Sequence, residues 1–375
     1  MHELVALDLP AGPTFVDALR AAWDAGDAVL PIDPRLPPPA IARLLDACRP
    51  ARIMSSDGAA SLPSSRPVAP GDALVVATSG TSGEPKGVVH THASVHASAV
   101  ASSTALSVDP GRDHWVACLP LAHIGGLSVV TRSLSTDTRC TVLPRFDAPE
   151  VERLSREGAT LVSLVATALA RTDVSLYRAV LLGGAAPPES VPDQVVATYG
   201  MTETGSGCVY AGRALPGVEI LIGDGTLGGL GEILIRGPML LRCYRDDTDP
   251  RLPGGWLPTG DGGHLGDDGT LSVDGRLADV IVTGAEKVWP AAVESVVSRH
   301  PSVSEVAVWK RPDPEWGERV VAWVVPRPGS DVPTAAELRD LVAGELGAWH
   351  APTEVVAMTA LPRTPGGKVR RVDLT

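Results

Sequence analysis

The 375-residue chain has few lysines: of its 32 basic residues only four are lysine, and 28 are arginine. It also lacks a surplus of positive charge, since its formal net charge is -12, so we expect no nucleic acid partner. The longest apolar run covers residues 159–170 and is too short to span a bilayer. The first residues, MHELVALDLPAG, carry acids where a secretory signal peptide has a basic segment. The sequence therefore predicts a cytoplasmic protein with no membrane insertion.

Cysteine is scarce and unpaired. The five cysteines are scattered and form no CxxC motif, which favours reduced thiols over disulfides or a zinc site. Hydrophobic residues make up 44% and charged residues 20% of the chain, which is ordinary for globular proteins and excludes a disordered chain. The length allows two or three domains.

The first part of the chain predicts an α/β fold. Residues 1–70 are expected to be helical and irregular, with helices over residues 14–25 and 41–48 and Pro-rich connections. Short apolar runs then alternate with helical stretches, which is typical of a mostly parallel sheet whose ligands gather at the carboxyl ends of the strands. The expected strands are 73–77, 114–118, 139–143, 160–165 and 179–182, and the expected helices are 92–103, 148–157 and 166–171.

The pattern changes twice toward the C-terminus. Short strands over 218–222, 231–236 and 270–273, separated by Gly-rich turns, predict a small antiparallel β subdomain. Strands over 280–283, 303–310 and 320–326 with helices over 291–300 and 334–346 predict a small α+β domain. We therefore expect a large N-terminal domain over residues 1–275, with an α/β core at about 71–216 and the β subdomain at about 217–275, and a small mobile C-terminal domain over 276–375.

The most informative segment is residues 78–88, TSGTSGEPKGV. Its glycines let the backbone approach a phosphate, its hydroxyls and N–H groups donate hydrogen bonds, and Lys86 adds a cation. The segment does not fit the Walker A pattern, and a Gly- and Ser-rich stretch by itself is more often a surface loop. The ordered TSGTSGxPKG string favours a phosphate-binding loop.

This loop resembles the phosphate loop of the adenylate-forming superfamily, which contains acyl-CoA synthetases, luciferases and the adenylation domains of peptide synthetases. Four further segments match the family's elements in the family's order. They are YGMTET at 199–204, PTGD at 258–261, GR at 275–276 with Asp279, Gly284 and Pro290, and LPRTPGGK at 361–368. Together they cover the chain from about residue 74 to its last residues.

The resemblance implies ATP, Mg²⁺ and CoA as partners in a reaction that joins a carboxylate to the α-phosphate of ATP and then transfers the acyl group to CoA. Glu203 would bind Mg²⁺, since a hard cation prefers carboxylate oxygen, and Lys368, on a mobile tail, would be the catalytic lysine. Taken singly, Asp261 is more often a turn residue, Arg276 a solvated charge and Lys368 a surface lysine. The implied ATP-binding residues are Thr78, Ser79, Gly80, Thr81, Ser82, Gly83, Lys86, Gly183, Gly184, Ala185, Tyr199, Gly200, Thr202, Asp261, Arg276 and Lys368, of which Lys86, Thr202 and Lys368 would act in catalysis together with His123.

The acid substrate is less clearly specified. The compact chain and the segments PLAHIGGLSV and SLVATALAR are most similar to o-succinylbenzoate–CoA ligases of menaquinone biosynthesis, above all the short actinobacterial ones. The resemblance implies that His123 lines the acyl pocket. Because such an acid has two carboxylates, we expect Arg171 with Thr167 to bind the second one. The alternatives are a packed core histidine for His123 and a charge that complements the helix dipole for Arg171.

Departures from the family pattern affect the C-terminal domain. Ala278 stands where many relatives have Asp or Lys, at the expected hinge over 276–279, and Gly284 is expected to line the CoA tunnel. The common YKxP is WHAP at residues 349–352. Other functions left open are another aryl- or acyl-CoA ligase, a stand-alone adenylation enzyme and a non-catalytic nucleotide-binding module. A homodimer is implied only by the family.

Overall fold

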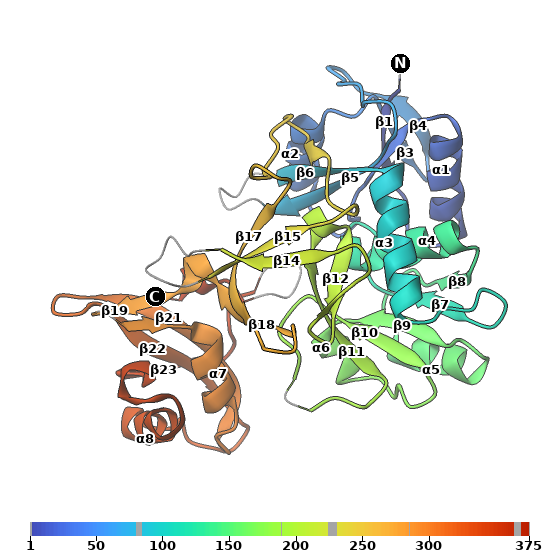
Figure 1. Ribbon diagram of the computed structural model, residues 1–375. Helices are drawn as coiled ribbons and strands as arrows, with labels where there is room; N and C mark the ends of the chain where they lie inside the picture. Colours follow the sequence, from blue (N-terminus) through green and yellow to red (C-terminus); the bar gives the residue numbers. More distant parts are fainter. Residues whose placement is uncertain are drawn as a thin grey trace. The chain divides into compact units, whose positions relative to one another are not determined.

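The computed structural model describes residues 2–79, 85–188, 190–223, 231–284, 286–363 and 369–374. The chain divides into two compact units (Figure 1). The large unit consists of residues 1–220, 235–257 and 269–271, and the small unit of residues 221–234, 258–268 and 272–375. The expected α/β fold class is confirmed. Among the described residues, none of the helices has both the length and the apolar composition needed to cross a membrane.

Two seven-stranded sheets form the framework of the large unit. The first has the order β16 (Cys243–Tyr244), β6 (Pro85–Thr91), β5 (Asp72–Ser79), β2 (Ala28–Pro31), β1 (Leu4–Asp8), β3 (Arg52–Ser55) and β4 (Gly58–Ser61). The second has the order β13 (Arg213–Ala214), β12 (Ser206–Tyr210), β11 (Val195–Met201), β10 (Ala179–Leu182), β9 (Leu161–Leu164), β7 (His114–Ala117) and β8 (Arg139–Val142).

The first sheet corrects two expectations. The interpretation of residues 1–70 as helical and irregular was only partly right: α1 (Pro13–Asp24) and α2 (Pro38–Cys48) confirm the two expected helices, but the strands β1 to β4, which were not expected, also lie there. The apolar residues of β1 and β2, four in each strand, are too few to reveal a periodicity, although all of them are buried. No strand was expected between 73–77 and the helix over 92–103, but β6 begins at Pro85, within the TSGTSGEPKG segment, and pairs antiparallel with β5. This sheet is therefore mixed, with parallel pairing among β3, β1, β2 and β5.

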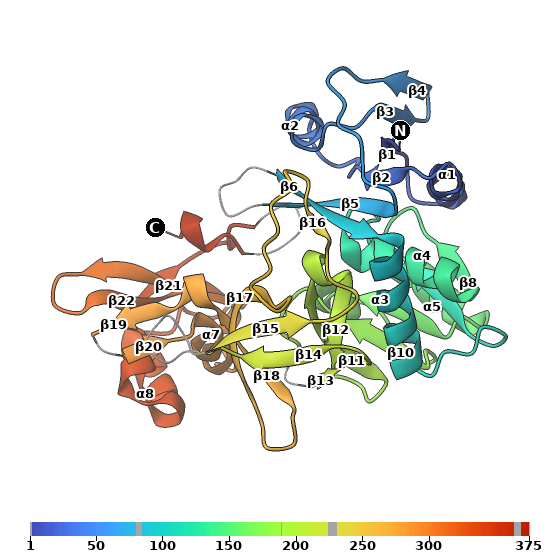
Figure 2. The same ribbon diagram turned by 45° about the horizontal axis from the view of Figure 1, so that its top comes forward.

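The second sheet fits the expected parallel pattern more closely. Strands β8, β7, β9, β10 and β11 pair in parallel, and only β12 and β13 are antiparallel. The helices of the large unit are α1 (Pro13–Asp24), α2 (Pro38–Cys48), α3 (His92–Ala105), α4 (Ile124–Thr136), α5 (Ala148–Arg156), α6 (Ala166–Leu169) and the 3₁₀ turn η1 (Thr202–Thr204). Helices α3 and α4 lie side by side in both views (Figures 1 and 2).

The core of the large unit forms where these helices meet the sheets. A buried cluster joins residues of α1, α3 and α4 to strand residues of both sheets, including Trp115 and Leu127, neither of which is exposed. Helix α3 is rich in Ala and Ser, and its small side chains allow α4 to approach closely. All five cysteines lie within the described residues, and none of them forms a disulfide.

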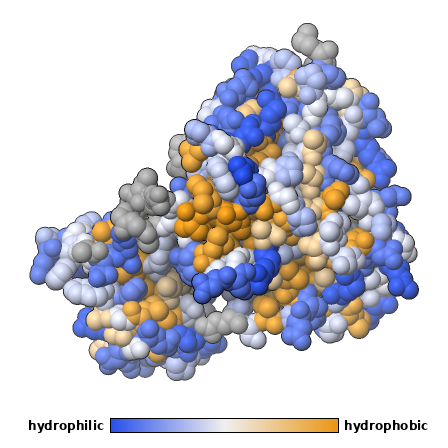
Figure 3. All heavy atoms as spheres, viewed as in Figure 1, coloured by the Kyte–Doolittle hydropathy of each residue, from blue (hydrophilic) through white to orange (hydrophobic). Residues whose placement is uncertain are grey.

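A third sheet has the order β14 (Glu219–Ile222), β15 (Glu232–Arg236), β17 (Leu257–Leu265) and β18 (Leu271–Arg276), and it contributes residues to both units. Its strands match the expected β subdomain in position. Hydrophobic residues gather over β14 and β15 on the face drawn in Figure 3. Leu221 of β14 has an exposed side chain.

The small unit contains a five-stranded sheet and two helices with their own buried cluster. The strands are β20 (Glu286–Val288), β19 (Ile281–Thr283), β22 (Gly317–Pro326), β21 (Val303–Asp313) and β23 (Glu354–Ala357), which pairs with β22. The helical segments are η2 (Leu277–Asp279), α7 (Pro290–Ser298), α8 (Ala335–Leu346), η3 (Ala348–His350) and η4 (Arg371–Asp373). Valines of β21, β22 and α7 dominate the cluster, as the sequence pattern predicts.

Candidate active site

The carboxyl edge of the second sheet of the large unit gathers several of the expected site residues. Strands β7, β9, β10 and β11 run in parallel, so the segments that follow them leave the same edge. These segments and the last residues of β11 contain the expected acyl-pocket and nucleotide residues. Tyr199 and Gly200 lie in β11, and the segments contain His123, Thr167, Gly183, Gly184, Ala185, Thr202 and Glu203. The segments after β9 and β10 lie close together, because a Cβ on Gly184 would lie 3.5 Å from Val165 Cγ1.

Glycine at this edge is required by backbone packing. A Cβ on Gly200 would lie 2.2 Å from the carbonyl oxygen of Ser206, and one on Gly183 would lie 2.8 Å from Thr198 Oγ1. Gly126, in the first turn of α4, faces the carbonyl oxygens of Leu119 and Pro120 at 2.5 Å from a built Cβ. Gly126, the second glycine of the LPLAHIGG segment, therefore allows α4 to start close to the turn that follows β7.

The phosphate-loop candidates lie at the ends of β5 and β6. Thr78 pairs with Lys86 and Ser79 with Pro85 across the antiparallel ladder. Gly80, Thr81, Ser82 and Gly83 lie outside the described residues. The loop is therefore held at both ends by a hairpin, which brings Thr78 and Lys86 to the same level of the sheet.

A cluster of three side chains connects this hairpin to the YGMTET segment. The ammonium of Lys86 lies 5.3 Å from the ring centroid of Tyr244, and the Tyr244 hydroxyl donates a 3.0 Å hydrogen bond to Glu203 Oε1. Burial, together with the nearby negative charge of Glu203, raises the pKa of the Tyr244 phenol, so it remains a donor. Sequence reasoning missed Tyr244, since no motif surrounds it.

The backbone of the YGMTET segment is held by a buried histidine. His90 Nε2 donates to the carbonyl oxygen of Thr202 at 2.7 Å, and its Nδ1 lies 3.3 Å from Ser94 Oγ. Burial lowers the pKa of His90 to about 4, so the ring is neutral near pH 7. This bond joins β6 to the turn that carries Thr202 and Glu203.

His123 occupies the position just before α4, and its side chain is about half exposed. Its Nε2 lies 3.5 Å from Asp33 Oδ2. Arg35 donates to both oxygens of Asp33, at 2.8 and 2.6 Å, and holds the pKa of that carboxyl below its usual value. His123 is therefore not a packed core residue but a partly exposed ring beside a fixed carboxylate, and Asp33 lies in the Pro-rich segment from which no site residue was expected.

Thr167 and Arg171 lie at the same edge, after β9. Helix α6 is shorter than predicted and ends at Leu169, so Arg171 follows the helix and is not part of it. Both side chains belong to exposed residues, and the Arg171 guanidinium lies 5.7 Å from the ring centroid of Phe146.

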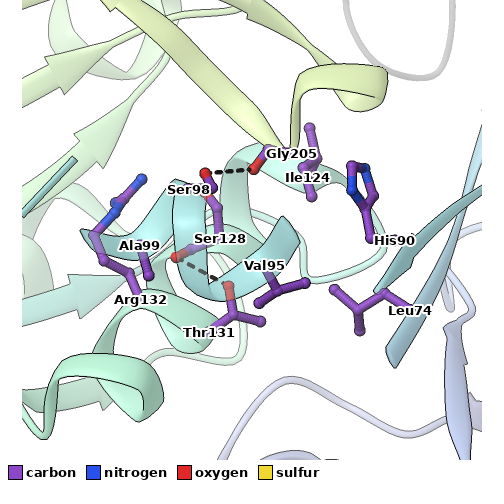
Figure 4. A pocket seen from close by; sticks show the side chains of 10 residues that line it. All are labelled: Leu74, His90, Val95, Ser98, Ala99, Ile124, Ser128, Thr131, Arg132 and Gly205. Atoms are coloured by element: carbon purple, nitrogen blue, oxygen red, sulfur yellow. Dashed lines mark hydrogen bonds between the residues drawn. The ribbon is translucent and has the colours of Figure 1, made fainter. Parts of the chain in front are cut away.

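A small cavity of about 10 Å³ lies between α3 and α4 and has room for about one water molecule (Figure 4). Arg132 lines it, is 1% exposed and lies over the ring of Trp115 at 4.9 Å. Within the described part of the chain, its Nε and Nη1 have no hydrogen-bond partner. A buried guanidinium with unpaired donors is costly unless an anion or water pairs with it. Sequence reasoning missed Arg132 because an arginine inside an apolar helix segment carries no motif.

The ribose candidates of the small unit contact each other. Asp261 lies on β17 and is 6% exposed, and its Oδ1 lies 3.0 Å from Arg276 Nε. Arg276 also donates from Nη1 to the carbonyl oxygen of Thr259 at 2.9 Å, and the backbone N–H of Asp261 donates to Thr259 Oγ1 at 3.1 Å. The TGD segment thus fixes both side chains, which sequence spacing alone did not reveal.

The expected hinge and tunnel residues are also in the small unit. Ala278 is exposed within η2, and its neighbour Asp279 pairs with Arg371 at 3.3 Å. Gly284 has φ +64°, and a Cβ there would lie 3.0 Å from the ring of Trp316, so a larger side chain would be strained in two ways. Lys368 lies outside the described residues.

The donor set at Glu203 suits Mg²⁺. Among the described residues, no group of three or more His, Cys, Asp or Glu side chains gathers as a protein-only metal site requires. Mg²⁺ is usually held by one or two carboxylates together with substrate phosphates and water. One half-buried carboxylate beside the phosphate-loop lysine fits this pattern.

The chain belongs to the AMP-binding enzyme family. The family model matches residues 51–245, and the model of the AMP-binding enzyme C-terminal domain matches residues 292–368. These ranges contain the loop after β5, the YGMTET segment and the LPRTPGGK segment, so the expected superfamily is confirmed.

Relatives of this chain include acid–CoA ligases. A probable 2-succinylbenzoate–CoA ligase of Mycobacterium tuberculosis is 40% identical over 80% of this chain and 83% of its own. An indoleacetate–CoA ligase of Aromatoleum aromaticum is 36% identical over 80% of this chain and 66% of its own. The solved o-succinylbenzoate CoA synthetase of Bacillus subtilis in complex with the acyl-adenylate intermediate has a TM-score of 0.87 at 28% identity, covering 100% of this chain and 88% of that one. The same synthetase, solved in complex with ATP and magnesium ion, has a TM-score of 0.86 at 28% identity, covering 99% of this chain and 89% of that one.

Proposed function

We propose that the protein is an AMP-forming acid–CoA ligase that uses ATP and Mg²⁺ to activate o-succinylbenzoate and transfers the acyl group to CoA. The cluster of Lys86, Tyr244 and Glu203 is the observation that best supports this activity. In it, a cation and the carboxylate proposed to bind the metal both contact Tyr244 at the end of the phosphate loop. The 40% identity to the mycobacterial ligase carries the choice of substrate.

The proposed chemistry has two steps. A carboxylate oxygen of the acid attacks the α-phosphorus of ATP, the bond to the bridging oxygen breaks, and pyrophosphate leaves. The CoA thiol, losing its proton, then attacks the acyl carbonyl, and AMP leaves. Because two anions meet in the first step, cations and hydrogen-bond donors supply the catalysis.

The first step assigns roles to residues of the large unit. Lys86 and the donors at 78–83 bind phosphate, and Thr202 donates to the α-phosphate. Glu203 holds Mg²⁺, which offsets phosphate charge. Adenine occupies the space beside Gly183, Gly184 and Ala185 and stacks on Tyr199.

The proposed ribose ligands belong to the small unit. Asp261 and Arg276 bind the ribose, in agreement with the short contact between them. Lys368 acts only in adenylation. We propose residues 276–375 as the mobile C-terminal domain, with a hinge near Ala278 that withdraws Lys368, and Gly284 as the lining of the thiol tunnel.

The acid occupies the edge beside His123. Its second carboxylate pairs with an arginine, and two candidates exist. Arg171, supported by Thr167, is exposed, whereas Arg132 is buried and has unpaired donors. The cost of those unpaired donors favours Arg132 as the anion ligand. Because the cavity beside it has room for about one water molecule, the carboxylate pairs with Arg132 through that water.

A second candidate function is a ligase for another aryl acid. The indoleacetate–CoA ligase relative at 36% identity favours it, since that name describes an acid with a single carboxylate. A cytoplasmic location, which the unpaired cysteines favour, and a homodimer, which only the family resemblance implies, are part of the proposal. Light scattering of the purified protein tests the dimer.

A coupled assay of pyrophosphate and AMP release tests the function. The purified protein is supplied with ATP, Mg²⁺ and CoA together with o-succinylbenzoate, indoleacetate or benzoate. We expect AMP as the nucleotide product and the highest kcat/KM for o-succinylbenzoate. ADP as the product would contradict the mechanism, and a preference for indoleacetate would favour the second candidate.

A further inference from the structure

Tyr244 lies between two groups that the adenylation step needs. Its ring faces the ammonium of Lys86 at 5.3 Å, and its hydroxyl donates to Glu203 Oε1 at 3.0 Å. One side chain therefore contacts the cation at the end of the phosphate loop and the carboxylate assigned to the metal. No other role has been given to this tyrosine.

The backbone around Tyr244 fixes this position from both sides. Strand β16 pairs antiparallel with β6, with Tyr244 opposite Val88. Lys86 is two residues from Val88, so it projects from the same face of the sheet and is a diagonal neighbour of Tyr244. The N–H of Arg245 donates to the carbonyl oxygen of Gly87 at 2.7 Å, which continues the pairing toward the loop.

The same segment also holds the backbone of the metal-binding turn. The N–H of Leu241 donates to the carbonyl oxygen of Glu203 at 2.8 Å. Glu203 is thus held by residues 241–244 at its main chain and at one carboxylate oxygen. A carboxylate held in this way loses little rotational freedom when it binds a cation.

We propose that Tyr244 is a positioning residue for adenylation. Its hydroxyl orients Glu203 so that the other carboxylate oxygen is available to Mg²⁺, and its ring holds Lys86 toward the phosphates of ATP. This inference rests on the proposed function, because it needs a nucleotide with a divalent cation at this edge.

Two substitutions separate the hydroxyl from the ring. Tyr244→Phe removes only the hydrogen bond to Glu203, whereas Tyr244→Leu also removes the aromatic face under Lys86. Tyr177→Phe is the matched control, because it removes one buried hydroxyl bond, to the carbonyl oxygen of Val151, elsewhere in the large unit. Melting temperatures of all three variants check that each is folded.

Binding of the non-hydrolysable analogue α,β-methylene-ATP is measured calorimetrically with Mg²⁺ and with EDTA. For Tyr244→Phe we expect about tenfold weaker binding with Mg²⁺ and unchanged binding in EDTA, as the loss of one hydrogen bond to a charged group predicts. For Tyr244→Leu we expect weaker binding under both conditions. Tyr177→Phe should match the wild-type protein in both. In adenylation assays, Tyr244→Phe should raise the Mg²⁺ concentration for half-maximal rate more than it lowers kcat.

The outcomes distinguish this inference from the proposed function. If wild-type protein binds the analogue with Mg²⁺ and Tyr244→Phe binds it equally well, the positioning role is wrong and the proposed function stands. Equal weakening with and without Mg²⁺ in Tyr244→Phe also overturns it, because a general packing defect would not depend on the metal. If the wild-type protein fails to bind the analogue, the proposed function fails and this inference with it. If adding Tyr244→Phe to Glu203→Gln weakened binding of the analogue with Mg²⁺ still further, the tyrosine would not act through Glu203.

Discussion

The substitution Arg132→Met tests whether a buried cation selects an acid with two carboxylates. Methionine keeps the apolar stem that packs near Trp115 but removes the charge and the donors. Arg132 is 1% exposed and has two unpaired donor atoms within the described part of the chain. A hydrogen bond between charged groups at such a site contributes about 1.5–3 kcal/mol, which corresponds to a factor of about 10–150 in kcat/KM.

The assay compares two acids that differ only in the second carboxylate. The ratio of kcat/KM for o-succinylbenzoate to that for 4-oxo-4-phenylbutanoate is measured in each variant, because any loss of folded protein cancels in the ratio. Arg132→Met should lower the ratio by the factor above. Arg171→Met is the matched comparison, and since its guanidinium is exposed and screened by solvent we expect a change of about threefold or less.

Two results would refute the reasoning about Arg132. An unchanged ratio in Arg132→Met would mean that the buried guanidinium does not contact the second carboxylate. If that unchanged ratio came with equal losses for both acids, the cation between α3 and α4 would have a structural role. A large loss confined to Arg171→Met would transfer the role to the exposed arginine.

Four further expectations follow from the site. Lys368→Ala should abolish adenylate formation but leave CoA transfer from supplied acyl-adenylate largely intact, and equal loss in both half-reactions would contradict a step-specific lysine. Ala278→Pro, which fixes φ, should slow CoA transfer much more than adenylation in single-turnover measurements, and parallel losses would refute the hinge. Asp33→Asn should lower kcat/KM about tenfold in the wild-type background but have no further effect in His123→Ala, because it acts through the 3.5 Å contact with that ring. The folded-state pKa of His90 lies at about 4, below its unfolded value, so the unfolded state binds more protons as pH falls from about 6.5 to 4. Denaturant unfolding should therefore show that the free energy of unfolding falls by up to about 3 kcal/mol over this range. The fall should be smaller in His90→Gln.

The sequence predicted the elements of the small unit well and the start of the chain poorly. The apolar patterns over 303–310, 320–326 and 334–346 are long, so they identified β21, β22 and α8 closely. Strands β1 and β2 are buried runs of five and four residues whose pattern does not distinguish a strand from part of a helix. Strand β6 was missed because Pro85 and two glycine-rich stretches indicated a loop, whereas pairing with β5 decides its conformation.

The family was readable from the sequence because the residue types of its segments and their order are specific. The segments TSGTSGEPKGV, YGMTET and PTGD identify the family, and the family match confirms it. Those segments carry information because phosphate, metal and ribose each require particular donors and acceptors at fixed spacing.

Only the tertiary structure decided which other residues support them. Tyr244 reaches Glu203 across 41 positions, and Asp33 reaches His123 from a Pro-rich segment near the start of the chain. Arg132 is a candidate anion ligand because the structure shows that it is buried. Asp261 and Arg276 form an ion pair, and Arg276 also bonds to the turn at Thr259. Local sequence fixes the chemistry of a side chain, but contacts between distant segments depend on sheet pairing and packing. The physical reason is that burial and pairing energies belong to the folded chain as a whole and not to any short window of it.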